Sequence, residues 1–134
     1  MPAPNFHVPF SIPKAYGGFA DCSGILKGSQ EGLALEFQSQ DGLVGIFRSG
    51  VRNKVLFWEE LQALDYRAGW FRTWLVISTA SLKSLEGVPG VQNARLHLKV
   101  SRNDRPHARE LATFASLRLC ERDLKEMQSR LETG

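Results

Sequence analysis

The side chains of this sequence that could carry out acid–base chemistry are few and widely separated. Asp65, His97 and the adjacent pair Glu59 and Glu60 have suitable groups, but no spacing among them matches a catalytic arrangement. The histidines and cysteines also lack the short spacings of metal ligands (His7, His97, His107, Cys22 and Cys120). No GxGxxG, GxxxxGK[ST], HExxH or GxSxG motif is present in the sequence. We therefore expect no catalytic residue, no cofactor and no metal, and a protein that is not an enzyme.

Two aromatic residues lie between two arginines in the segment RAGWFR at residues 67–72. Gly69 indicates a tight turn, which would place Trp70 and Phe71 at the tip of a hairpin with Arg67 and Arg72 beside them. Tryptophan favours interfaces and arginine binds phosphate groups, so one hypothesis is a stacking surface or a peripheral contact with a membrane. The alternative is that the two rings fold back over the end of the domain.

A second candidate surface lies near the C-terminus, where apolar residues recur at intervals of 3, 4, 3 and 4 (Leu117, Cys120, Leu124, Met127 and Leu131). This spacing is typical of the seam of a coiled coil over two heptads, and residues of both charges surround it. We interpret Leu124, Met127 and Leu131 as a surface for a second copy of the chain, giving a homodimer, or for a protein or peptide partner. The alternative is that the helix curves and keeps packing on its own domain.

Alternation of apolar and polar residues predicts a series of short antiparallel strands (20–27, 33–40, 44–48, 51–58, 63–68, 72–79 and 95–101). The periodicity then changes to 3.6, which predicts a helix capped by Asn103 or Asp104, with Pro106 in its first turn, running to about Leu131. The predicted fold class is mainly β with a C-terminal α-helix, and the expected architecture has about seven antiparallel strands.

The first thirteen residues hold four of the six prolines and still alternate between apolar and other residues from Phe6 to Pro13. Because proline lacks an N–H donor, this pattern indicates an extended arm laid on the domain as an edge strand or a polyproline segment. The arm would either cover an exposed edge of the core or add a strand to another subunit. The expected division is an arm at 1–18, the domain at 19–120 and a helix extension at 121–134.

Composition describes a single globular domain, since the 134 residues are 43% hydrophobic and 23% charged. The net charge of +3 is too small to indicate nucleic-acid binding. Seven basic residues between Arg95 and Arg122 form either a patch for an anionic partner or an ordinary solvated face. The N-terminal segment has no basic stretch followed by an apolar one, so we expect a cytoplasmic protein with two reduced cysteines.

The order of predicted elements resembles the pleckstrin-homology superfold. The segments GLVGIFRSG at 42–50, VLFWEEL at 55–61, GWF at 69–71 and TWLVI at 73–77 are similar to those of bacterial pleckstrin-homology-like domains. The resemblance covers about residues 20–119. It implies two bent sheets that form a partly open barrel, closed at one corner by the final helix.

The best-known activity of that family is binding of phosphoinositide head groups by basic residues on the first strand and after the first turn. Here Lys27 ends the predicted first strand, but the turn at 28–32 carries only Glu31 as a charged residue. One lysine does not supply the several converging donors that a phosphate needs, so the sequence argues against phosphoinositide binding. The leading hypothesis is a non-enzymatic interaction or scaffold module that binds a protein or peptide. A membrane-surface adaptor for anionic lipid and a carrier of a small apolar ligand are the alternatives.

Overall fold

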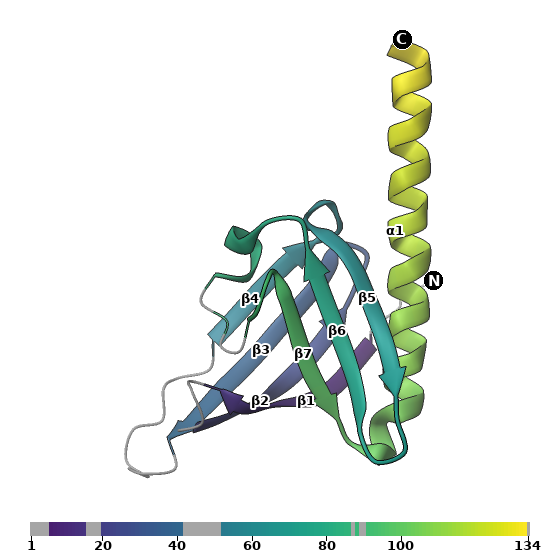
Figure 1. Ribbon diagram of the computed structural model, residues 1–134. Helices are drawn as coiled ribbons and strands as arrows, with labels where there is room; N and C mark the ends of the chain where they lie inside the picture. Colours follow the sequence, from purple (N-terminus) through teal and green to yellow (C-terminus); the bar gives the residue numbers. More distant parts are fainter. Residues whose placement is uncertain (1–5, 16–19, 42–51, 87, 89–90, 134) are drawn as a thin grey trace.

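A computed structural model describes residues 6–15, 20–41, 52–86, 88 and 91–133 (Figure 1). Within them the chain forms seven antiparallel strands in one sheet, followed by one long helix. The strands are β1 (Phe6–Ala15), β2 (Ala20–Gly28), β3 (Gly32–Asp41), β4 (Arg52–Phe57), β5 (Leu61–Ala68), β6 (Thr73–Thr79) and β7 (Arg95–Val100). The prediction of a mainly β domain with a C-terminal helix is confirmed.

The strands follow the order β4-β3-β2-β1-β7-β6-β5 across the sheet. Figure 1 shows β1 to β4 inclined to β5, β6 and β7, so the sheet bends where β1 meets β7. At this junction the described register contains the single pair Ser11↔Lys99, whereas β1 and β2 pair along most of their length. β4 and β5 are the two ends of the order, and the short 3-10 helix η2 (Trp58–Glu60) connects them directly.

The predicted edge position of the N-terminal arm is wrong, because β1 lies in the interior of the sheet between β2 and β7. Its inward residues are buried as expected, with Val8, Phe10 and Ile12 in the core. Proline is tolerated in this interior strand because Pro9 and Pro13 flank Ser11, where the pairing with β7 is limited to one residue pair. A missing N–H donor costs little where the ladder is already interrupted.

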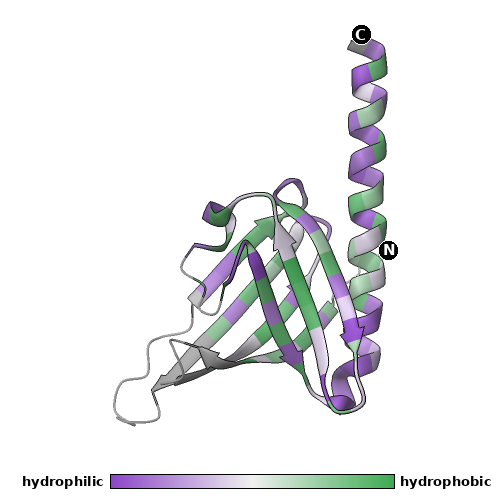
Figure 2. Ribbon diagram, viewed as in Figure 1, coloured by the Kyte–Doolittle hydropathy of each residue, from purple (hydrophilic) through white to green (hydrophobic). Residues whose placement is uncertain are grey.

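Side chains that alternate along the strands build the core between the sheet and the helix. Along β7, Leu96, Leu98 and Val100 are buried, and the residues between them are exposed. Figure 2 shows this alternation of hydrophobic and hydrophilic residues. Two short 3-10 helices also follow strands, η2 after β4 and η3 (Leu82–Leu85) after β6. The predicted strand at 44–48 and the whole segment at 42–50 used for the resemblance lie outside the described residues.

The C-terminal helix α1 (Arg105–Thr133) follows the 3-10 turn η4 (Arg102–Asp104) and packs against β5, β1 and η2. The residues that face the sheet are buried (Ala108, Leu111, Ala112, Ala115 and Leu119). The helix approaches β2 closely at Gly28, since a Cβ there would lie 2.4 Å from Cδ1 of Leu111 and that side chain would have to move. Among the described residues, no helix is both long and apolar enough to cross a membrane.

Candidate interaction surfaces

The second half of α1 continues past the end of the sheet (Figure 1). Leu119 is the last helix residue described as buried, and every residue from Asp123 to Glu132 is exposed. Successive helix residues are rotated by about 100°, so the stripe that faces the sheet continues through Arg122, Glu126 and Ser129. This stripe therefore turns polar where the sheet ends, and the helix extension has no apolar face for its own domain.

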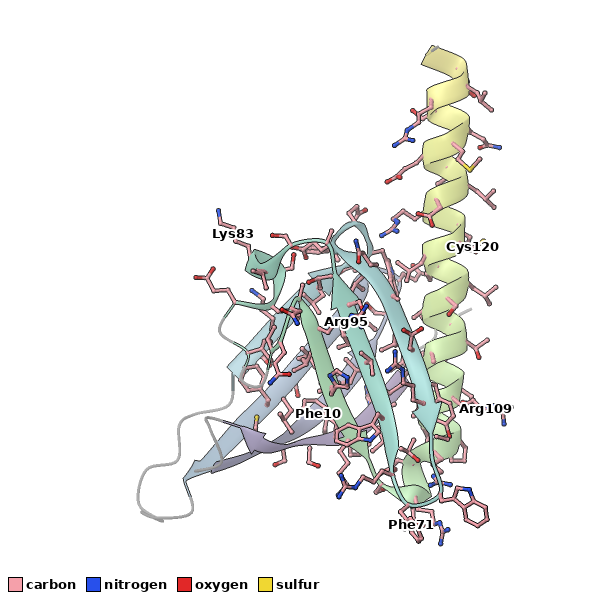
Figure 3. The ribbon with its side chains drawn as sticks, viewed as in Figure 1. Phe10, Phe71, Lys83, Arg95, Arg109 and Cys120 are labelled. Atoms are coloured by element: carbon pink, nitrogen blue, oxygen red, sulfur yellow. The ribbon has the colours of Figure 1, made fainter. Side chains whose placement is uncertain are left out.

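The apolar residues of the extension lie on the opposite side of the helix. We call Leu117, Cys120, Leu124, Met127 and Leu131 the seam, and all five are exposed. Cys120, labelled in Figure 3, lies on the side of α1 that faces away from the sheet. The alternative in which the helix curves and packs these residues on its own domain is therefore wrong.

Arg122 joins α1 to the rest of the domain near the end of the sheet. Its guanidinium donates to the main-chain carbonyl oxygens of Trp58 and Leu61 at the two ends of η2. A further nitrogen of the same group lies 2.9 Å from a carboxylate oxygen of Asp123. One turn earlier, the Arg118 guanidinium lies 5.3 Å from the ring centroid of Phe114. These contacts fix the direction in which the extension leaves the domain.

An apolar groove of about 570 Å³ adjoins the start of the seam, between the beginning of β1 and α1. Phe6, Phe114 and Leu117 are its apolar walls, and the Phe6 and Phe114 ring centroids are 4.9 Å apart. This groove lies on the outer surface of the domain rather than within the core. It therefore extends the apolar surface of the seam toward β1 and is no enclosed site for a small ligand.

The β5–β6 hairpin presents its two aromatic residues to solvent. Trp70 is 88% exposed and Phe71 is 94% exposed, so neither ring folds back over the domain. Figure 3 shows Phe71 at the tip, beside the beginning of α1. The turn itself is tight, since the Gly69 N–H donates to the Arg72 carbonyl at 2.7 Å.

A recess of about 290 Å³ lies beside this hairpin, where the sheet, η4 and α1 meet. It is lined by Trp70, Phe71, Thr73, Val100, Arg102 and Arg105. Arg105 donates to the Gly69 carbonyl at 3.3 Å, which ties the hairpin to the helix. Thr73 pairs with Ala68 on β5 and with Val100 on β7, its side chain faces inward, and it is 1% exposed. Within the described part of the chain, its hydroxyl and Nε of Arg105 are buried and have no hydrogen-bond partner.

The polar residues considered for catalysis are not brought together. Asp65 and His97 both pair with Val76, so the full width of β6 separates them, about 10 Å. Glu60 is already engaged, because its carboxylate accepts from the Phe57 N–H at 3.0 Å and from the Ser84 hydroxyl at 3.4 Å. Among the described residues, no three potential metal ligands lie close enough together to hold an ion.

Lys27, the one basic residue at the position that phosphoinositide binding would use, is held in an ion pair. Its Nζ lies 2.8 Å from a carboxylate oxygen of Glu36 on the neighbouring strand. The partner is therefore Glu36 and not Glu31 in the turn. The sequence did not identify this ion pair, because the pairing of β2 with β3 brings the two side chains together. The contact supports the argument from the sequence against a phosphate site there.

The basic residues between 95 and 122 do not form one patch. Arg118 and Arg122 are engaged on the helix, whereas Arg102 and Arg105 join the hairpin recess. The sequence did not identify Arg102 and Arg105 as neighbours of Trp70 and Phe71. They are more than thirty positions away in the chain, and only the packing of α1 against β5 brings them to the hairpin.

The two cysteines have opposite environments and form no disulfide. Cys22 is fully buried in β2, and this burial raises the pKa of its thiol because the charged thiolate would be desolvated. Cys120 is exposed in the middle of the seam. Only Cys120 is therefore placed to react with a partner or a reagent.

Comparison with models of known families gave no match to this chain, and neither curated proteins nor solved structures gave one. Inferences about function therefore rest on the geometry of the chain itself.

Proposed function

We propose that this protein is a non-enzymatic interaction module of the pleckstrin-homology-like type that associates with a second copy of itself through the seam of α1. The observation that carries the proposal is the reversal of polarity along the helix. Up to Leu119 the buried apolar residues of the helix face the sheet, whereas the seam, which begins at Leu117, faces away from it and the sheet-facing stripe becomes polar beyond Leu119. An apolar stripe over two heptads that is exposed in the monomer is typical of a helix that pairs with another helix.

A second copy fits this surface in shape and in charge. The seam points away from the domain, so two domains would sit on opposite sides of a helix pair without colliding. Between residues 121 and 132 the extension carries three basic and four acidic side chains, a net charge of −1. Two such helices repel each other only weakly, because each carries a net charge of −1 and both offer acidic and basic side chains that can pair across the interface. The groove at Phe6 and Phe114 adds apolar area next to Leu117.

The pleckstrin-homology-like assignment is supported by the arrangement of the sheet. β1 joins the β1–β4 group to the β5–β7 group, and the two ends of the sheet order, β4 and β5, are adjacent in sequence across η2. The helix packs at this corner through Arg122 and η2. A bent sheet with a helix at its corner is the architecture that the sequence resemblance implies.

The test is the mass of the protein in solution, measured by light scattering coupled to gel filtration. We expect the wild-type chain to give about twice the 15.0 kDa mass of one copy. Leu124→Glu places a charge in the centre of the seam and should raise the dissociation constant at least tenfold, since a buried unpaired charge is costly. Ser129→Glu adds the same charge on the opposite side of the helix and should leave the mass unchanged.

Two results would contradict the proposal. One is a wild-type protein that remains a monomer at the highest concentration reached. The other is a dimer whose dissociation constant Leu124→Glu does not change, because the pairing surface would then lie elsewhere. Circular dichroism of each variant shows whether the fold is intact, so that loss of the dimer is not confused with unfolding.

A further inference from the structure

The tip of the β5–β6 hairpin combines features that the proposed helix pairing does not use. Trp70 and Phe71 are the two most exposed large hydrophobic side chains described, and they are consecutive residues at the end of the hairpin, at the rim of the recess. The turn is held in place by the Gly69–Arg72 hydrogen bond and by the donation from Arg105 to Gly69. The rings are therefore presented to solvent by a fixed scaffold.

Four arginines surround these two rings. Arg67 and Arg72 flank the turn, and Arg102 and Arg105 line the recess beneath it. Within the described part of the chain, the guanidinium groups of Arg67, Arg72 and Arg102 make no hydrogen bond or ion pair. The acid nearest in sequence to Arg102 and Arg105 is Asp104, whose carboxylate accepts a hydrogen bond from the Ser101 hydroxyl at 2.7 Å. The local charge is thus positive and largely unpaired.

The recess also contains buried polar groups that lack partners. The Thr73 hydroxyl and the Nε–H of Arg105 are both shielded from solvent and unpaired among the described residues. Buried donors without partners are uncommon, because each loses its hydrogen bonds to water without replacing them. Both groups can donate to an oxyanion, and Arg102 adds a charged donor beside them.

We infer that this tip is a contact site for an anionic membrane surface. Arg102 and Arg105 bind a lipid phosphate in the recess, Arg67 and Arg72 face neighbouring head groups, and Trp70 and Phe71 enter the interfacial layer. A planar bilayer fits because two adjacent rings, each almost fully exposed at the end of a hairpin, can insert together. A nucleic acid or an acidic peptide would contact aromatic and basic residues along an extended groove, whereas the recess here is small, at about 290 Å³. This inference does not depend on helix pairing, since none of these residues belongs to the seam.

The experiment is flotation of the full chain with vesicles of phosphatidylcholine containing phosphatidylglycerol, compared with phosphatidylcholine alone, at low and at raised salt. We expect recruitment to the anionic vesicles only, weakened by salt because the attraction is screened. Arg72→Gln with Arg102→Gln should reduce the partition coefficient about 25-fold, at about fivefold for each arginine. Trp70→Ser with Phe71→Ser should reduce it at least tenfold.

A matched control uses η3, which carries an exposed apolar residue beside an exposed basic one. Leu82→Ser with Lys83→Gln removes both from a site distant from the tip (Figure 3) and should leave recruitment unchanged. Quenching of tryptophan fluorescence by brominated lipid chains gives a second measurement, which Trp70→Phe should abolish. Light scattering confirms that the tip variants keep the oligomeric state of the wild type.

The inference is overturned if no anionic vesicle recruits the protein at low salt, or if neutral vesicles recruit it equally. It is also overturned if the arginine and aromatic variants bind vesicles as the wild type does. Binding of a single-stranded oligonucleotide without vesicle recruitment would assign the same arginines to a different partner and would likewise reject the membrane site.

Discussion

The guanidinium of Arg122 donates to the main-chain carbonyl of Trp58, a residue 64 positions earlier in the chain. The same nitrogen donates to the carbonyl of Leu61, so one side chain forms hydrogen bonds with carbonyl oxygens at both ends of η2. Because η2 connects the two ends of the sheet order, this contact fixes the helix at the corner where the sheet does not close on itself. Beyond this contact, the helix residues from Asp123 to Glu132 are exposed.

Replacing Arg122 should lower the stability of the whole domain. Arg122→Gln leaves two carbonyl oxygens without their charged donor and should reduce the free energy of unfolding by about 1–3 kcal/mol, the usual range for a hydrogen bond to a charged group. Urea denaturation followed by circular dichroism measures this change. Lys125→Gln, on an exposed position of the same helix, should change the stability by less than about 0.5 kcal/mol. Equal stability of both variants would contradict the role assigned to Arg122.

Glycine at position 32 is required by the pairing of β3 with β4. Its φ is +156°, and a Cβ there would lie 2.0 Å from the carbonyl oxygen of Leu56. Gly32→Ala must therefore move the backbone and should cost about 2 kcal/mol or more in thermal or urea unfolding. Gly69→Ala is the matched control, since its Cβ would meet the Arg72 carbonyl oxygen at 3.3 Å. We expect a cost below about 1 kcal/mol there, and a larger cost than at position 32 would refute this account.

The buried thiol of Cys22 should make stability depend on pH in the alkaline range. Its pKa is raised above the ordinary value of 9.0, so the native state holds the proton more tightly than the unfolded state. This contribution to stability is fully present below the unfolded-state pKa and is lost as pH rises through the native pKa. The stability advantage of the wild type over Cys22→Ala should therefore shrink between about pH 7 and pH 10. An advantage that stays constant or grows would be inconsistent with desolvation of the thiolate.

Cys120 offers a test of how two copies pair, which rests on the proposed self-association. In a parallel helix pair each residue of the seam meets its own counterpart, so the two Cys120 thiols come within disulfide range. Mild oxidation should then produce a covalent dimer on a non-reducing gel, and Cys120→Ser should abolish it. Cys22 is buried and does not contribute. If the dimer forms in solution but oxidation gives no crosslink, the helices are antiparallel.

Some of the architecture could be predicted because it depends on local patterns. Leu96, Leu98 and Val100 alternate along β7, and Ala108, Leu111 and Ala115 recur at helical spacing along α1, so the buried face of each element follows from residues that are close together in the chain. The position of β1 could not be predicted. Its prolines indicated an edge strand, and only the tertiary arrangement shows that the sheet is interrupted beside Ser11.

The sequence alone determined the fold class, the apolar seam and the aromatic hairpin, since each is written in residues that are close together in the chain. The tertiary structure decided what those segments do. It showed that the seam faces away from the domain, because the buried residues Ala108, Ala115 and Leu119 lie on the other side of α1 and the helix continues past them to Thr133. It also placed Arg102 and Arg105 beside Trp70, since the packing of α1 on β5 brings distant segments together. Local patterns specify which face of an element is apolar, and only packing specifies which faces remain uncovered.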